Sequence, residues 1–235
     1  MKKSVLVLAI VAAFAPVLAQ AEAGDWVVRA RVVNINPDED SKLGKTINKN
    51  ITAVAGGMTP GAELKVDSNT IPEFDISYYV TKNIALELIL ATGSKHDVSI
   101  TGSNFATIPN QLLGSVDVLP PTLTAQWHFN PDQTFDPYVG AGINYTAFLD
   151  KKLNIRQGPL SGYKIQVDSD SWGYALQAGL DVNLKDGWLI NADIKYVTID
   201  TDVELKGAAT GNRWTKIDSL DINPWVFGVG IGKKF

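Results

Sequence analysis

The chain has 235 residues, a formal net charge of −4 and no cysteine. The acidic balance argues against nucleic acid as a partner, because binding a polyphosphate backbone requires a surplus of Lys and Arg. The lack of cysteine excludes disulfides, so a large buried surface must hold the fold together.

The N-terminal segment has the composition of a secretory signal. Two lysines precede an apolar run over residues 5–18, and small residues follow. This pattern predicts a signal peptide over residues 1–21, cleaved after Ala21 or Ala23, and a single domain over residues 22–235. The remainder has no run of eighteen apolar residues, so we expect no membrane-spanning helix.

The rest of the chain alternates between apolar and polar residues with a period of two, which is typical of strands. The connections between these runs alternate between short turns and long polar segments, as in a transmembrane β-barrel with short periplasmic turns and long extracellular loops. The long polar segments are 37–70, 93–117, 150–170 and 206–218. The eight predicted strands of this all-β, antiparallel barrel are 25–36, 71–80, 84–92, 118–129, 137–149, 171–184, 188–205 and 219–235.

One face of these strands is almost free of charge and rich in aromatic and aliphatic residues. The interior of a soluble eight-stranded barrel is too narrow for so many large side chains, so we expect this face to meet lipid. Ten residues separate Trp225 from Phe235. At ~3.4 Å per residue and a tilt of about 40°, this distance matches the ~25 Å apolar band of an outer-membrane barrel. A soluble β-sandwich is the alternative.

Near the short turns, the opposite face carries charges of both signs. Buried charges need partners of opposite sign, so we expect these residues to pair across the lumen and form a closed floor. The predicted floor consists of Arg29, Arg31, Glu87, His128, Asp181, Asp193 and Lys195.

Toward the long loops, the inward residues become apolar and predict a vestibule that opens on the loop side. One interpretation is that they pack the upper lumen. The other is that they bind a small hydrophobic molecule, since ligand pockets are mostly apolar and concave. The predicted vestibule consists of Val33, Ile35, Ile89, Phe148, Val197, Ile199, Leu220, Ile222 and Val226.

Three prolines lie within the predicted strands. Pro120, Pro121 and Pro224 cannot donate a ladder hydrogen bond, so they weaken strand pairing locally. A ligand blocked by the floor would have to leave sideways, and these prolines mark where a gap in the wall could form.

The closing stretch NPWVFGVGIGKKF contains three alternating glycines. A phosphate-binding loop would need a helix directly after the glycines, and only three residues follow Gly232. We therefore expect a strand whose glycines face the lumen and leave room for the charged floor. Its terminal Phe235 resembles the signal by which the barrel-assembly machinery recognises outer-membrane proteins.

Several stretches resemble the outer membrane protein W family, which includes alkane-uptake proteins. They are LPPTLTAQWHF, PYVGAGINYTAF, SWG and PWVFGVG with the terminal phenylalanine. The resemblance covers the whole mature chain. It implies an eight-stranded outer-membrane barrel, in contact with membrane lipids and lipopolysaccharide, that moves small hydrophobic molecules. Lys195 departs from the family pattern, which has a large apolar residue there.

Other functions find less support in the residues. The chain has two histidines: His96 lies in a long polar segment, and His128 lies at the end of a predicted strand, with no serine at strand spacing after it. We expect no enzymatic activity, no cofactor and no metal site, because two distant histidines without cysteine do not make one. A structural, adhesive or receptor barrel that acts through its loops without transport remains the alternative.

Overall fold

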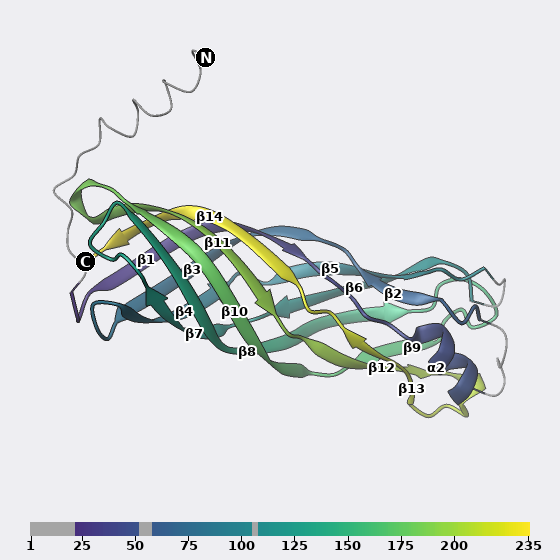
Figure 1. Ribbon diagram of the computed structural model, residues 1–235. Helices are drawn as coiled ribbons and strands as arrows, with labels where there is room; N and C mark the ends of the chain where they lie inside the picture. The colour runs from purple at the N-terminus through teal and green to yellow at the C-terminus, as the bar shows by residue number, and fades with distance from the viewer. Residues whose placement is uncertain (1–21, 52–57, 105–107) are drawn as a thin grey trace, which may run out of the picture.

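The computed structural model describes residues 22–51, 58–104 and 108–235, so the predicted signal peptide lies outside the described residues. Eight antiparallel strands form a closed ring in the order β10, β11, β14, β1, β3, β4, β7, β8, and β8 pairs back with β10 (Figure 1). The predicted barrel is confirmed. Its strands are β1 (Trp26–Asn36), β3 (Asn69–Tyr79), β4 (Ile84–Ala91), β7 (Thr122–His128), β8 (Phe135–Asn154), β10 (Asp170–Asn183), β11 (Trp188–Val197) and β14 (Trp225–Lys234).

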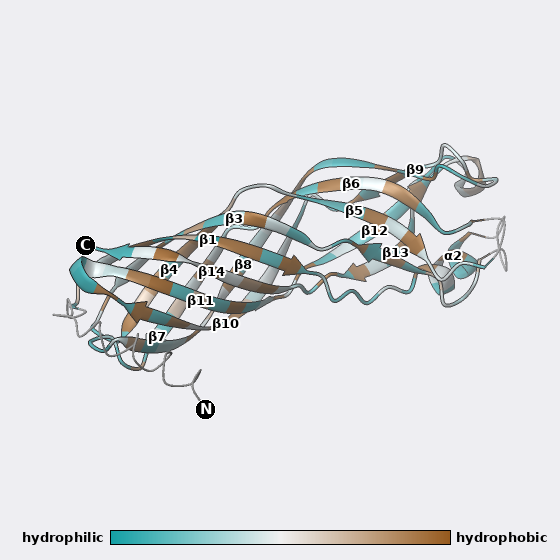
Figure 2. Cartoon of the chain, turned by 90° about the horizontal axis from the view of Figure 1, so that it is seen from above, coloured by the Kyte–Doolittle hydropathy of each residue, from teal (hydrophilic) through white to brown (hydrophobic). Residues whose placement is uncertain are grey.

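Side chains alternate between the two faces of the wall as the sequence predicts. In β1, Val28 and Val32 point outward and are exposed, whereas Arg29 and Arg31 point inward and are buried. Apolar segments recur along the barrel strands (Figure 2). Within the described ranges, every helix is too short or too polar to cross a membrane.

Tight turns join the strands at the end where the C-terminus lies (Figure 1). The 3-10 turn Lys185–Gly187 links β10 to β11, and its Asp186 and Gly187 have φ values of 59° and 75°. Glycine takes this left-handed conformation at little cost and aspartate tolerates it, which explains the KDG sequence.

The barrel continues beyond the ring of eight strands as a second stretch of sheet, called here the upper sheet, and the segments predicted as long loops contain most of it. Sequence periodicity did not predict the strands in these polar segments. Inward-facing Ser and His hide the alternation, and shifts of register at Val98/Ser99 and Val203/Glu204 interrupt it. The additional elements are β2 (Glu63–Val66), β5 (Ser94–Thr101), β6 (Gln111–Leu119), β9 (Lys164–Val167), β12 (Asp200–Lys206), β13 (Thr215–Asp221), the helix α2 (Leu43–Asn50) and the 3-10 turn η3 (Ala208–Thr210).

The segment that follows β1 closes this upper sheet at both of its edges. On one side, Asp40 forms a bridge with Asp221 of β13. On the other, the backbone N–H of Val66 in β2 donates to the Glu39 carboxylate at 2.6 Å, and that of Leu64 donates to the Ser41 hydroxyl at 2.8 Å. An open strand edge invites association with other chains, and this segment covers both.

Three predicted strands are each divided into two. The run 118–129 breaks at Pro120 and Pro121, the run 188–205 breaks after Val197, and the run 219–235 breaks before Trp225. The breaks at Pro120 and Pro121 and before Trp225 follow from backbone chemistry, because proline supplies no N–H to a ladder. The break after Val197 lies opposite Pro224. Asn223 takes a positive φ of 37°, and its side chain replaces a ladder bond by accepting from the Ile199 N–H at 3.0 Å.

The closing strand β14 pairs with β1 on one side and with β11 on the other. Its glycines leave room for the arginines of the floor, since a Cβ would lie 2.8 Å from Arg31 Cγ at Gly230 and 2.8 Å from Arg29 Cγ at Gly232. At Gly230 it would also lie 2.2 Å from the Ala30 carbonyl oxygen. Phe235 exchanges backbone hydrogen bonds of 2.8 and 3.1 Å with Trp26, and its side chain is exposed. Its role in assembly stays a prediction.

We expect Gly230→Ala to destabilise the barrel by about 1–3 kcal/mol, because the added methyl group collides with backbone atoms that cannot move freely. Urea unfolding in lipid vesicles, followed by tryptophan fluorescence, measures the loss. Gly228→Ala is the matched control on the same strand and face, since its methyl group would meet the movable Val33 side chain at 3.2 Å. Equal losses in the two variants would contradict this account.

Candidate functional site: a charged floor beneath an apolar cavity

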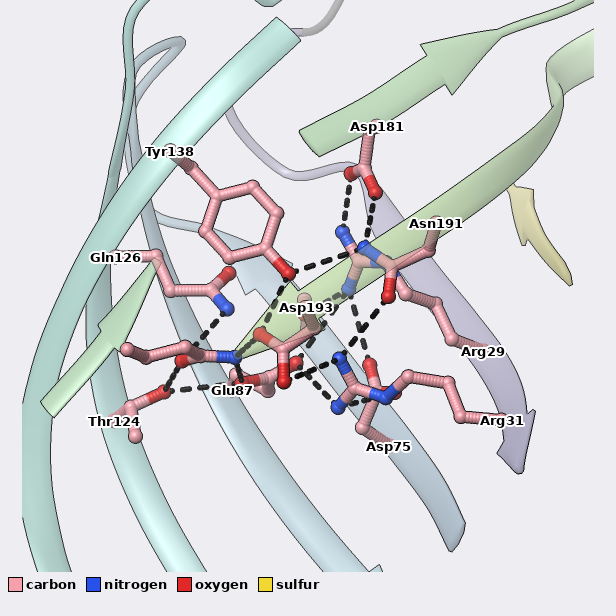
Figure 3. Close-up of polar contacts among 12 residues, drawn as sticks. Arg29, Arg31, Asp75, Glu87, Thr124, Gln126, Tyr138, Asp181, Asn191 and Asp193 are labelled. Atoms are coloured by element: carbon pink, nitrogen blue, oxygen red, sulfur yellow. Dashed lines mark hydrogen bonds and ion pairs between the residues drawn. The ribbon is translucent and has the colours of Figure 1, made fainter. Parts of the chain in front are cut away.

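Arg29 lies at the centre of the lumen floor. Its guanidinium nitrogens are 3.0 Å from the Asp75 carboxylate on β3 and 2.6 Å from Asp181 on β10, and it donates to the Ser77 hydroxyl at 2.8 Å (Figure 3). The Arg29 side chain is fully buried. The Arg29 side chain thus connects its own strand, β1, with β3 and β10.

Arg31 lies two residues further along β1, on the same face, and is the second centre of the floor. Its nitrogens lie 2.9 Å from Glu73, 2.9 Å from Asp75 and 3.2 Å from Glu87. It also donates to Asn191 at 3.3 Å. The two arginines therefore share carboxylates, and the floor is one connected network (Figure 3).

Neutral groups link the carboxylates on the far side of the lumen. Gln177 donates to Glu87 at 2.9 Å and to Asp193 at 2.8 Å, and the Tyr138 hydroxyl donates to Asp193 at 3.1 Å. All seven residues predicted for the floor are buried. The prediction omitted Glu73, Asp75, Gln177 and Tyr138, although their inward positions follow from the same period of two.

His128 lies below the arginines as a hydrogen-bonded lumen residue. Its Nδ1 is 2.7 Å from the Asp136 carboxylate, and the Tyr79 hydroxyl is 3.2 Å away. Ligand atoms of His128, Asp136 and Asp181 come within 4.8 Å of one another. Arg29 pairs with Asp181, and His128 pairs with Asp136.

Above the floor lies an apolar cavity, and all nine residues predicted for the vestibule line it. Its space is about 1130 Å³ when the open mouth is included. A few polar side chains also face it, among them Glu73, Asn144 and Thr146. Lys195 lines the cavity as well, so it lies at the boundary between cavity and floor and not deep within the floor.

An apolar cluster packs at the end of the barrel above the cavity. Leu43 and Ile47 of α2 are fully buried in an apolar cluster with Leu113 and Ile217 at the far end of the barrel (Figure 1). Sequence periodicity missed this packing because α2 is short and lies in a polar segment. The cluster also supports the interpretation that part of the apolar lining packs the upper lumen.

Asp218 on β13 attaches the start of this helical segment. Its carboxylate accepts a hydrogen bond from the Lys42 backbone N–H at 2.9 Å and another from the Ser41 hydroxyl. Burial raises the pKa of the Asp218 carboxyl, while the hydrogen bonds from Ser41 and Lys42 oppose that rise. The attachment combines a buried acid with two donors from one segment.

The wall is incomplete beside Pro120 and Pro121. The ladder between β4 and β7 ends at the pair Ile89 and Thr122, and the next pair in the wall joins Ser94 of β5 to Val118 of β6. In the described wall, no backbone hydrogen bond joins residues 90–93 to residues 119–121. Pro120 also lines the cavity.

Pro224 lies in a different environment. The Val197 N–H donates to the Pro224 carbonyl at 3.1 Å, and the Ile222 carbonyl accepts from Asp38 at 2.9 Å. Hydrogen bonds thus bridge the wall on both sides of this proline, unlike the strip beside Pro120 and Pro121.

The family model described as the OmpW family matches residues 22–235. The chain belongs to the OmpW family. Outer membrane protein W of Vibrio cholerae is 36% identical over 238 residues, which is 100% of each chain. The crystal structure of OprG from Pseudomonas aeruginosa superposes with a TM-score of 0.77 at 30% identity, covering 93% of this chain and 99% of that one. A more distant relative, the dibenzothiophene metabolism operon protein PahQ of P. aeruginosa, is 24% identical over 92% of this chain and 90% of its own.

Membership of the OmpW family confirms the resemblance and the outer-membrane location. It orients the barrel, with the tight turns on the periplasmic side and the upper sheet outside the cell, and it places the outward apolar face in lipid. The family consists of outer-membrane barrel proteins and not of a class known for catalysis.

In this OmpW-family barrel, we expect Arg29→Met to lower the free energy of unfolding by about 3–5 kcal/mol, because it leaves Asp75 and Asp181 buried without their cation. Urea titration in lipid vesicles measures this value. Lys216→Met, which removes an exposed pair with Asp202, is the control and should cost less than about 1 kcal/mol. A loss below 1 kcal/mol for Arg29→Met would show that the floor does not hold the barrel together.

Proposed function

We propose that this OmpW-family barrel admits small hydrophobic molecules into its apolar cavity and releases them sideways into the outer leaflet. The observation that carries the proposal is an apolar cavity that ends on a charged floor. Such a cavity suits a ligand that is mostly hydrocarbon, because burying it costs no hydrogen bonds.

The floor supports the sideways route. Arg29, Arg31 and Lys195 contact a larger number of buried carboxylates, and these groups fill the lumen between the cavity and the periplasmic turns. An apolar molecule that passed through would have to break ion pairs and leave charges without partners, which costs several kcal/mol.

The unpaired strip beside Pro120 and Pro121 supplies the proposed exit. Pro120 lines the cavity on the inside, and Leu119 and Leu90 are exposed on the lipid side of the same part of the wall. Only side-chain packing, and no ladder, holds the wall together there. Proline keeps the strip unpaired because it has no N–H to donate.

The proposed partners follow from the location. Outer-leaflet lipid and lipopolysaccharide would surround the exit, and the assembly machinery would bind the strand that ends at Phe235. PahQ, by its name, belongs to a dibenzothiophene metabolism operon, which is consistent with an aromatic, apolar cargo for a related barrel. A barrel that acts through its extracellular end is the alternative, and the packed cluster around α2 favours it.

We expect Ile199→Asp and Ile222→Asp to reduce protein-dependent uptake of a small hydrocarbon such as octane by at least about tenfold. Each places a carboxylate in the apolar cavity, where a charge is costly and attracts water. Uptake of labelled octane by cells with and without the protein is the measurement. Leu112→Asp is the control, since Leu112 is exposed on the outer surface of β6. Unaltered uptake in both cavity variants would refute transport through this cavity.

We expect the double variant Pro120→Leu, Pro121→Leu to slow octane uptake several-fold, because the new N–H groups can extend the ladder toward residues 90–93. Hydrogen exchange should show greater protection of those amides. Pro224→Leu is the matched control, since the wall is already bonded on both sides of Pro224. Full uptake in a double variant with a protected strip would rule out this exit.

A further inference from the structure

Most polar groups that face the cavity are already paired with one another. Thr146 donates to Asn144 at 2.7 Å, and Asn144 donates to Thr122 at 2.8 Å. The ring nitrogens of His96 lie 2.8 Å from the Ser94 hydroxyl and 2.8 Å from a backbone carbonyl. These groups therefore have hydrogen-bond partners without a ligand.

Glu73 and Lys195, at the base of the cavity, differ from the rest. Both are buried, with 3% exposure each, and both line the cavity. One carboxylate oxygen of Glu73, Oε1, lies 2.9 Å from Lys195 Nζ and 2.9 Å from Arg31 Nε. The second oxygen, Oε2, has no hydrogen-bond partner among the described residues.

Lys195 also keeps an unused donor. Its ammonium group donates to Glu73 at 2.9 Å and to Asp193 at 2.7 Å. An ammonium has three N–H donors, so one is left. A free acceptor and a free donor therefore lie side by side at the base of an apolar cavity.

A hydroxyl group complements this pair, because one hydroxyl can donate to Glu73 Oε2 and accept from Lys195 Nζ. We propose that the base of the cavity binds the hydroxyl end of a neutral, otherwise hydrocarbon molecule, such as an aliphatic alcohol. This inference rests on the proposed function and deepens it by naming the class of ligand.

The charge of the floor excludes the matching acid. Three cations, Arg29, Arg31 and Lys195, contact five carboxylates, Glu73, Asp75, Glu87, Asp181 and Asp193. A ligand carboxylate at the base would meet a surplus of negative charge, with Glu73 Oε2 directly beside it. The site therefore selects an alcohol over the acid of the same chain length.

The test compares octane, 1-octanol and octanoate, which share a chain and differ at one end. Uptake of each labelled compound is measured in cells that express the protein and corrected for cells that lack it. We expect 1-octanol to be taken up about tenfold faster than octanoate, a ratio that corresponds to one hydrogen bond to a charged group.

The variant Glu73→Gln replaces the free acceptor oxygen with an NH2 donor while it keeps the shape of the side chain. We expect it to reduce the ratio of 1-octanol to octanoate uptake about tenfold, with octane uptake of the same variant measured to normalise both rates. Glu63→Gln, at an exposed position of β2, is the control and should change neither rate.

The octane arm separates the two proposals. Protein-dependent octane uptake with equal rates for 1-octanol and octanoate in the unmodified protein would overturn the hydroxyl site and leave the proposed function intact. An unchanged ratio of 1-octanol to octanoate uptake in Glu73→Gln would also overturn the hydroxyl site and leave the proposed function intact. No protein-dependent uptake of any of the three compounds would refute the proposed function itself.

Discussion

The pairing of Arg29 and Arg31 with buried carboxylates is the constraint on which the rest of the structure depends. An eight-stranded barrel leaves an interior that side chains must fill, and here they fill it with charge. Each guanidinium reaches acids on several strands, at 2.6 to 3.2 Å in the closest contacts. Removing either arginine would leave buried carboxylates without a full set of partners where water cannot replace the cation. The network therefore ties distant strands of the wall to one another.

The features around this network follow from it. The closing strand carries glycine where it passes Arg29 and Arg31, because a Cβ there would collide with their strand. The cavity ends where the network begins, with Glu73 and Lys195 belonging to both. Since the floor is closed by charge, an apolar ligand has no route downward, and an unpaired strip of the wall lies beside Pro120, which lines the cavity. The charged floor and the unpaired strip thus both favour a sideways path for an apolar ligand.

Much of this arrangement could be predicted from a period of two. The inward positions of Arg29, Glu87 and Asp181 follow directly from alternation along each strand, and so do those of the apolar lining. The extracellular half could not be predicted in this way. Its strands are interrupted by shifts of register, as at Val98 and Ser99, and each shift moves later side chains to the other face. Helix α2 is too short to show a clear helical period.

The sequence by itself determined the barrel, its lipid-facing surface and the division of the lumen into charged and apolar halves, because alternation records which side chains face which way. Only the tertiary structure decided which charges pair, that the wall is bridged on both sides of Pro224 but on one side only of Pro121, and that α2 packs the outer end. These features depend on contacts between residues far apart in the chain, such as Arg29 and Asp181. Strand register and barrel closure bring such residues together, and neither can be read from local sequence.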